Sequence, residues 1–276
     1  MTTSGFDNRT AIFLAAVCSQ AYTQFNDPEG NFVVPYSYEQ VAEIRARSLT
    51  GVSEIFGFII QSESHVIIAF RGTSTTTDWI SDAMASQVKY KFADNAGQTH
   101  RGFTNIYCSA RKSILSVLED MSPDKILTIT GHSLGGALAT LCALDAADNS
   151  PFGQPVAYTY GSPRVGDPTF ARSFDKRVAD SFRVQNRFDV VTHLPPENFK
   201  LPRRDKTFYY DHVCQRVGLS FHNGSVPGNH VISGYYDDLA KRDPLFAERL
   251  GALNPGLCPE SSRYVFNPPE AIPSSS

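Results

Sequence analysis

The chain lacks an excess of charge of either sign and lacks any long apolar run. Its 276 residues carry 25 Lys and Arg against 28 Asp and Glu, which gives a formal net charge of −3. Without a basic excess there is no electrostatic footprint for nucleic acid and no attraction to an anionic lipid surface. No segment approaches the roughly 20 apolar residues that a membrane-spanning helix needs. We therefore predict neither nucleic-acid binding nor stable membrane insertion.

Cysteines are few, and they are not spaced as metal ligands. The five cysteines, without a Cys-x-x-Cys pair, are Cys18, Cys108, Cys142, Cys214 and Cys258. We interpret four of them as small core residues, with a Cys18–Cys258 disulfide as the less favoured alternative. The acidic residues at 27–29 and 237–238 have the pattern of a turn and of a helix surface. The sequence therefore predicts no metal site.

Internal repeats and a Pro/Gly/Ser-rich linker are also missing. With 41% hydrophobic residues the chain can bury one large core, so we predict a single domain over residues 1–262. Residues 263–276 are rich in Pro and Ser, and we predict a disordered tail there. The sequence leaves the oligomeric state unknown.

A short apolar segment near the N-terminus has some features of a secretory signal. Arg9 precedes the apolar run at 11–17, but Asp7 offsets its charge and the run has only about the minimum length. We interpret the segment as a helix of the folded domain. Lacking a convincing signal, the sequence slightly favours the cytoplasm, with secretion as the alternative.

The most informative motif is Gly131-His132-Ser133-Leu134-Gly135. A β-branched apolar run precedes it, and Ala and Leu recur at helical spacing after it. A strand, a Gly-flanked turn carrying a Ser, and a helix form a nucleophile elbow, which lifts the hydroxyl off the end of a parallel sheet. The Leu134 amide and the positive end of the helix dipole then face the developing negative charge. We predict Ser133 as a nucleophile. The alternative is a Gly-rich strand–helix connection in which this Ser has no catalytic role.

A nucleophilic Ser needs a His base and a carboxylate, which follow it in the chain order Ser, acid, His. Asp189 comes directly after the strand-like residues 182–186 and before Leu-Pro-Pro, so it is expected at the same sheet edge as Ser133. We predict Asp189 as the acid. The less favoured competitors are Asp167, Asp175, Asp180, Asp205 and Asp211.

Four histidines follow Ser133. His230 comes after a Pro-Gly-Asn loop and opens a helical pattern, so it should project from a loop-to-helix junction, and we predict it as the base. His212 lies in a strand-like stretch and is the reserve candidate. His193 is too close in sequence to the acid, and His222 lies in a turn typical of an exposed loop tip.

With these residues the chain resembles the class 3 lipase family, the filamentous-fungal triacylglycerol lipases and their bacterial and plant relatives. The resemblance covers roughly residues 10–245 in the family's order. The shared blocks are residues 70–73, 100–103, 131–136 and 158–167, Asp189 with its Leu-Pro-Pro, residues 210–213, and His230 followed by Tyr235. It supports Ser133, Asp189 and His230 as a catalytic triad and implies a structural position for His212.

The fold implied by the resemblance is the α/β-hydrolase fold, with a mostly parallel, twisted central sheet and helices on both faces. The active site is expected at the carboxyl edge of the strands. The early strands, near residues 53–61 and 65–70, should pair antiparallel as a hairpin. Fungal members commonly carry disulfides, but their cysteine pairs have no counterpart that we can place in this chain.

The resemblance also assigns residues outside the triad. Thr73 follows Arg-Gly at the exit of an early strand, and it would give the oxyanion hole its second amide beside that of Leu134. The segment after Thr73 corresponds to the family's lid, in which Trp79, Ile80 and Met84 would fold over an apolar acyl groove. The alternative for Trp79 is a fixed core position.

The family implies a serine carboxylic-ester hydrolase, a lipase that cleaves acylglycerol esters at an oil–water interface through an acyl-enzyme, without a cofactor. Phospholipase A1 and feruloyl-type esterase are alternatives that would use the same triad. From another class, a catalytically inactive binding module is a further alternative, against which the intact set of Ser, Asp and His argues.

Overall fold

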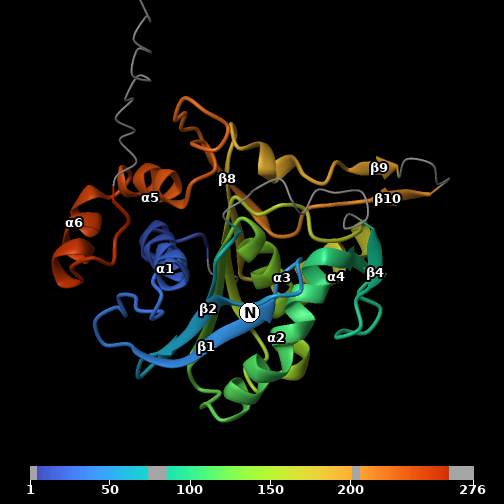
Figure 1. The fold of residues 1–276 in the computed structure, drawn as a ribbon, viewed down its shortest axis with the longest axis horizontal. Helices are drawn as coiled ribbons and strands as arrows, with labels where there is room; N and C mark the ends of the chain where they lie inside the picture. The colour runs from blue at the N-terminus through green and yellow to red at the C-terminus, as the bar shows by residue number, and fades with distance from the viewer. Residues whose placement is uncertain (1–4, 74–85, 201–205, 261–276) are drawn as a thin grey trace, which may run out of the picture.

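A central sheet lies between two layers of helices in the computed structural model, which describes residues 5–73, 86–200 and 206–260 (Figure 1). Three helices cover one face of the sheet: α1 (Asn8–Asn26), α5 (Ile232–Ala240) and α6 (Pro244–Leu253). Three others cover the opposite face: α2 (Arg101–Glu119), α3 (Leu134–Asn149) and α4 (Pro168–Arg177).

Seven strands form the sheet, in the spatial order β1-β2-β3-β6-β7-β8-β11. Their bounds are β1 Glu39–Arg47, β2 Ser53–Gln61, β3 His65–Phe70, β6 Ile126–His132, β7 Val156–Tyr160, β8 Ser181–Asn186 and β11 Gln215–Leu219. The first three strands pair antiparallel, and the predicted hairpin of β2 and β3 is confirmed. From β3 to β11 all neighbours are parallel. The predicted α/β-hydrolase architecture, mostly parallel with helices on both faces, is therefore confirmed.

Alternation along β3 shows how the sheet separates two apolar cores. Val66, Ile68 and Phe70 pack into the core under α2, α3 and α4. Ile67 and Ala69 pack into the core under α1, α5 and α6. Because both faces of the strand are covered, its sequence is an unbroken apolar run rather than an alternating one.

The segment with signal-like features forms α1. Asp7 caps the helix through a 2.7 Å hydrogen bond from the Thr10 amide. Its Ala-rich apolar face is buried against the sheet and α5. The prediction of a helix in this segment is confirmed.

Among the described residues, two small hairpins and one 3₁₀ helix lie beside the main sheet. Their bounds are β4 Gln87–Lys89 paired with β5 Gln98–His100, β9 Asn198–Lys200 paired with β10 Thr207–Tyr209, and η2 Val190–His193. The η2 turn begins directly after Asp189 and, like the hairpin of β9 and β10, lies at the top of Figure 1.

All five cysteines fall within the described residues, and none of them is in a disulfide. Cys18 and Cys142 are buried, as expected for small core residues. Cys214 and Cys258 are half-buried and pack against the two cores, whereas Cys108 is exposed, so the four cysteines other than Cys108 lie in or against a core. The pair Cys18 and Cys258 is not bridged.

Some predictions concern residues whose structure is not described. The lid residues Trp79, Ile80 and Met84 lie outside the described residues, as do Asp205 and the tail at 263–276. Within the described ranges, no helix combines the length and the apolar character needed to cross a membrane. The single domain over residues 1–262 stays a prediction.

Candidate active site

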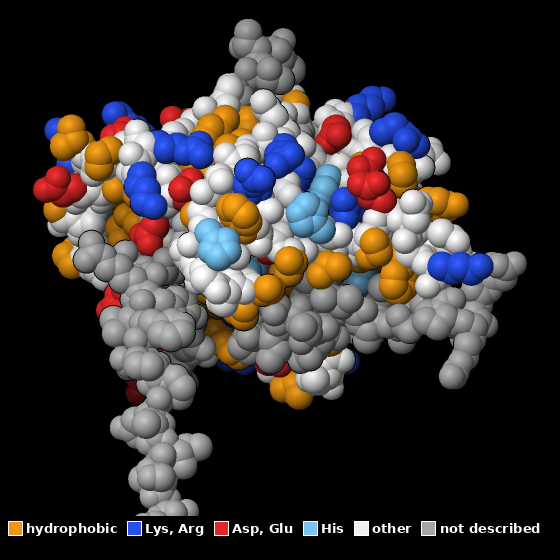
Figure 2. Space-filling model, turned by 90° about the horizontal axis from the view of Figure 1, so that it is seen from above, with side chains coloured by type: hydrophobic (Ala, Val, Ile, Leu, Met, Phe, Trp, Pro, Cys, Tyr) orange, Lys and Arg blue, Asp and Glu red, His pale blue; other side chains and the backbone are white. Residues whose placement is uncertain are grey.

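Three chain segments meet at the carboxyl edge of the sheet. Ser133 follows β6, Asp189 lies in the loop after β8, and His230 lies in the loop before α5. The last two loops are both at the top of Figure 1. Figure 2 views the molecule from that end, where hydrophobic side chains and histidines lie close together on the surface.

Ser133 occupies a strained backbone conformation, with φ +59° and ψ −129°. A residue with a side chain rarely adopts a positive φ, and this strain is typical of a nucleophile elbow. The flanking glycines are sterically required. A Cβ on Gly131 would collide with the backbone of Gly135, and a Cβ on Gly135 would collide with the backbone at Phe70 and Arg71. The elbow therefore depends on glycine on both sides.

Hydrogen bonds join the three predicted triad residues in one line. The Ser133 Oγ lies 2.7 Å from His230 Nε2, and His230 Nδ1 lies 2.7 Å from Asp189 Oδ2. All three side chains are buried. With the proton on Nδ1 donated to the carboxylate, Nε2 is left to accept the serine proton. This geometry can generate a nucleophilic alkoxide.

The carboxylate of Asp189 has further donors. The Val191 amide donates to Oδ1 at 2.9 Å, and the Tyr235 hydroxyl donates to Oδ2 at 2.6 Å. Burial, together with the Asp189 charge, raises the pKa of Tyr235 well above its usual value, so this hydroxyl remains a donor. Sequence reasoning noted Tyr235 only as a family position and a helical apolar residue; its placement one turn after the base was the available signal.

Two backbone amides are candidates for an oxyanion hole. Leu134 is the first residue of α3, and amides in a first helical turn have no partner within the helix. Thr73 follows Gly72, whose Cα lies so close to the nucleophile that an added Cβ would be 2.7 Å from Ser133 Cβ. Both residues are thus brought to Ser133, while their role in oxyanion binding remains a prediction.

The competing acids and histidines are not brought into this line. Asp167 caps α4, and Asp175 accepts a hydrogen bond from the Cys214 amide. His212 Nε2 donates to the carbonyl of Thr192 at 2.8 Å, so it packs against the loop that carries Asp189. His222 is exposed, as expected for a loop tip.

A network behind the nucleophile was missed by sequence reasoning. His132 Nε2 lies 2.6 Å from the carbonyl of His230, which can only accept, so Nε2 carries the proton. Nδ1 therefore accepts from the Tyr22 hydroxyl at 2.7 Å. Burial, with His230 nearby, holds the pKa of His132 well below its usual range, which keeps this ring neutral. A sequence signal for Tyr22 was available in the family resemblance, because family members begin with an Ala-rich helix that carries an Ala-Tyr pair, here Ala21-Tyr22 in the C-terminal part of α1.

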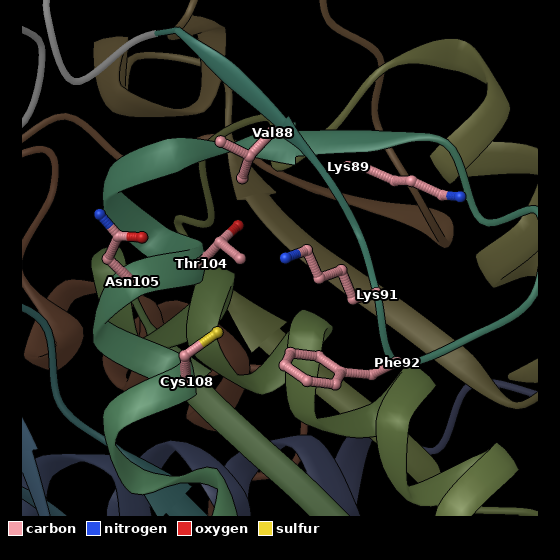
Figure 3. A pocket seen from close by; sticks show the side chains of 7 residues that line it. All are labelled: Val88, Lys89, Lys91, Phe92, Thr104, Asn105 and Cys108. Carbon is pink, nitrogen blue, oxygen red and sulfur yellow. The ribbon is translucent and has the colours of Figure 1, made fainter.

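A cavity of about 220 Å³ lies away from the triad, between the segment that includes β4 and helix α2 (Figure 3). Its lining side chains are Val88, Lys89, Lys91, Phe92, Thr104, Asn105 and Cys108. None of these residues belongs to the candidate active site. Among residues 5–73, 86–200 and 206–260, no group of three or more His, Cys, Asp or Glu is arranged to hold a metal ion.

Comparison with known proteins gives matches to lipases. The family model described as "Lipase (class 3)" matches residues 67–199. The secreted mono- and diacylglycerol lipase MDL3 of Malassezia globosa is 33% identical over 216 residues, which make up 70% of this chain and 67% of that protein. The chain belongs to the class 3 lipase family.

A solved structure from the same family agrees with the fold. Lipase II from Rhizopus niveus superposes with a TM-score of 0.59 and 26% identity, covering 69% of this chain and 75% of that one. A lipase of Rhizomucor miehei is 36% identical over 144 residues, half (50%) of this chain. The match spans only 39% of that protein, and the matches to two Rhizopus lipases span 40%. Plant phospholipases A1 are also among the relatives.

Proposed function

We propose that this class 3 lipase-family chain is a serine carboxylic-ester hydrolase that cleaves acylglycerol esters through an acyl-enzyme. The observation that carries the proposal is the hydrogen-bonded line from Ser133 through His230 to Asp189. A strained elbow, a buried carboxylate and a base between them are the parts that acyl transfer needs.

In the proposed reaction, Ser133 Oγ attacks the ester carbonyl while His230 Nε2 takes the hydroxyl proton. Asp189 holds the imidazole and stabilises its positive charge. The amides of Leu134 and Thr73 donate to the oxyanion of the tetrahedral intermediate. His230 then protonates the leaving alcohol, and water, activated by the same base, hydrolyses the acyl-enzyme.

A phospholipase A1 activity is the second candidate, because plant phospholipases A1 are among the relatives. It would use the same Ser133, His230 and Asp189 on a different glycerolipid. Neither reaction needs a cofactor. Hydrolysis of triolein, phosphatidylcholine and methyl ferulate, measured side by side, separates these two candidates and the feruloyl-type alternative. A series of p-nitrophenyl esters then gives the preferred acyl length.

Labelling with a fluorophosphonate tests the proposal directly. We expect one adduct, on the peptide that carries Ser133, and no adduct on Ser133→Ala. That variant should lose nearly all ester turnover while keeping the wild-type circular dichroism spectrum. An adduct on another Ser, or full turnover by the folded variant, would overturn the assignment of Ser133. Wild-type protein that takes no adduct and hydrolyses no ester would instead favour the inactive binding module.

Secretion and action at a lipid surface belong to the same proposal. MDL3 and a Fusarium solani relative are both named as secreted lipases. These names favour secretion for this chain, and the slight preference for the cytoplasm is not supported. We also propose that residues 74–84 act as a lid. Trp79→Ala should then lower turnover of an emulsion far more than turnover of a dissolved short-chain ester, whereas equal losses would contradict a lid.

A further inference from the structure

Gly72 directly precedes Thr73, the proposed oxyanion donor, and lies against Ser133, the proposed nucleophile. A Cβ at this position would lie 2.6 Å from the Tyr22 hydroxyl and 2.7 Å from Ser133 Cβ. Because β3 and β6 are parallel neighbours with Phe70 opposite Gly131, the chain leaving β3 must pass directly beside the elbow. The orientation of the peptide group after Gly72 therefore decides where the Thr73 amide points.

Both backbone polar groups of Gly72 are held by side chains. Its amide donates to the Tyr22 hydroxyl at 2.9 Å, and its carbonyl accepts from Arg71 Nη1 at 2.7 Å. In a trans peptide the carbonyl and the following N–H point in opposite directions. Fixing the Gly72 carbonyl against Arg71 thus fixes the Thr73 N–H, which points the opposite way in the same peptide plane.

Arg71 is itself held rigidly. Its side chain is only 2% exposed, and Nε donates to the Ile55 carbonyl at 2.6 Å. Nη2 forms an ion pair with Glu54 at 2.8 Å, so three guanidinium nitrogens each have their own acceptor. The guanidinium carbon lies 3.5 Å from the Phe25 ring centroid, a cation–π contact. Lys has one ammonium nitrogen in place of the planar guanidinium, so it cannot reproduce this planar set of contacts.

Tyr22 is equally constrained. Its hydroxyl donates its proton to His132 Nδ1 and accepts a hydrogen bond from the Gly72 amide, so these two partners fix the position of the hydroxyl. His132 in turn donates to the carbonyl of His230. A single, largely buried chain of hydrogen bonds therefore runs from the strand exit at Gly72 to the backbone of the proposed base.

We propose that Arg71 and Tyr22 are positioning residues, which hold Gly72 between them and so aim the Thr73 amide at the oxyanion beside Ser133. This inference rests on the proposed ester hydrolysis. In this role Arg71 and Tyr22 act through the Gly72 backbone groups that they bind. Preorganised donors account for much of the rate in acyl transfer, and a misplaced donor lowers kcat more than it alters substrate binding.

A thionoester substrate separates this role from a merely structural one. Sulfur replaces the carbonyl oxygen that the oxyanion hole binds, and sulfur is a poorer hydrogen-bond acceptor. The thionoester reaction therefore depends less on the Thr73 amide, while it needs the triad equally. The test measures kcat and KM for p-nitrophenyl butyrate and its thiono analogue. The kcat for the oxoester divided by the kcat for the thionoester reports on the oxyanion hole.

We expect Tyr22→Phe and Arg71→Lys each to lower kcat for the oxoester on the order of tenfold or more. In the same two variants kcat for the thionoester should fall less, so the ratio of oxoester to thionoester kcat falls. KM for both substrates should change little. Matched controls are Tyr90→Phe, which removes a buried hydroxyl bonded to the Leu141 carbonyl, and Arg111→Lys, which alters a partly buried ion pair with Asp145. The controls should keep the wild-type ratio.

The outcomes are distinguishable. A wild-type ratio in both Tyr22→Phe and Arg71→Lys, each folded by circular dichroism, overturns the positioning role even though ester hydrolysis stands. An equal fall of the ratio in the two control variants also overturns it, because the effect would then be general loss of packing. Wild-type protein that hydrolyses neither ester and takes no fluorophosphonate overturns the proposed function, and the inference falls with it.

Discussion

The two loops that carry the acid and the base are held in different ways. The acid loop, residues 187–197, is fixed by side chains that reach it from other elements. The base loop, residues 220–231, is mostly bonded to itself. The difference indicates which part of the candidate site tolerates a single change and which part does not.

Three buried or half-buried cationic or polar side chains hold the acid loop. Arg164 donates from Nη1 to the carbonyls of His193 and Pro195, at 2.6 and 3.0 Å. His212 donates to the Thr192 carbonyl, and Gln185 donates to the Thr192 hydroxyl at 2.8 Å. The loss of one such bond leaves the others in place. We infer that the position of Asp189 is overdetermined.

Local bonds shape the base loop. The Asn223 amide donates to Asn229 Oδ1 at 2.7 Å, and the His230 amide donates to the Pro227 carbonyl at 3.0 Å. Apart from the triad bonds of the His230 ring, two hydrogen bonds from outside the loop reach Asn229 and His230: from Asn186 Nδ2 to the Asn229 carbonyl and from His132 Nε2 to the His230 carbonyl. The loop tip is exposed, including Val226 at 56%. Fewer outside contacts therefore fix the base than fix the acid.

The largest expected effect comes from His230 itself. His230→Ala should lower kcat on a soluble ester by on the order of 10⁴-fold or more, because the base bonded to the Ser133 hydroxyl is then missing. His212→Ala, which removes a side chain that holds the acid loop, should mainly lower the free energy of unfolding and leave most of kcat. The measurements are steady-state kinetics and thermal unfolding of both variants. Near-normal turnover by His230→Ala would contradict the triad.

An intermediate effect is expected at Asn186, the last residue of β8. Its side chain is fully buried, donates to the Asn229 carbonyl and accepts from the Phe221 amide at 3.2 Å. Asn186→Ala should cost about 1–3 kcal/mol of unfolding free energy, the usual range for stranding buried polar groups. It should also lower kcat by roughly tenfold, because His230 then loses part of its outside support.

The matched change on the acid loop is Arg164→Gln, which removes two bonds to the carbonyls of His193 and Pro195. It should cost a similar amount of unfolding free energy with a smaller loss of kcat. If the two variants lose equal stability and equal activity, the acid and the base are held equally firmly, and the contrast between the loops is wrong.

The sequence predicted those parts of the site that local chemistry determines. The elbow at Ser133 could be found because a strand, two obligatory glycines and a helix follow one another within a short stretch. Asp189 and His230 could be found because each stands at a junction of a regular element with a loop. For these residues, the neighbouring residues in the sequence are enough to predict where in the fold the side chain lies.

The supporting residues could not be found in this way, because they are ordinary residue types whose partners lie far along the chain. Tyr22 contacts His132 across 110 positions, and Asn186 contacts Asn229 across 43. The edge strands were missed for a related reason. β1 and β11 are partly exposed and polar, and β11 contains Gly218, so neither has the unbroken apolar pattern of β3.

The smallest effect on activity is expected from a change that alters the pH dependence of stability, and this change tests how the acid loop is held. Burial, with Arg183 and Arg164 nearby, lowers the pKa of His212 to about 3. In the unfolded chain an ordinary His takes a proton near pH 6.5. Between these values the unfolded state binds one more proton than the folded state, so the contribution of His212 to stability falls as the pH falls.

His212→Gln removes this proton uptake and keeps an N–H for the Thr192 carbonyl. At pH 8, where His212 is neutral in both states, the variant should be less stable than wild type because of packing alone. As the pH falls from 6.5 towards 4, the difference in unfolding free energy between wild type and variant should narrow by up to about 1.4 kcal/mol per pH unit. Denaturant unfolding of both proteins at pH 8, 6, 5 and 4 measures this difference. Parallel curves for the two proteins would mean that His212 is protonated in the folded state, and a neutral donor would not then hold the acid loop.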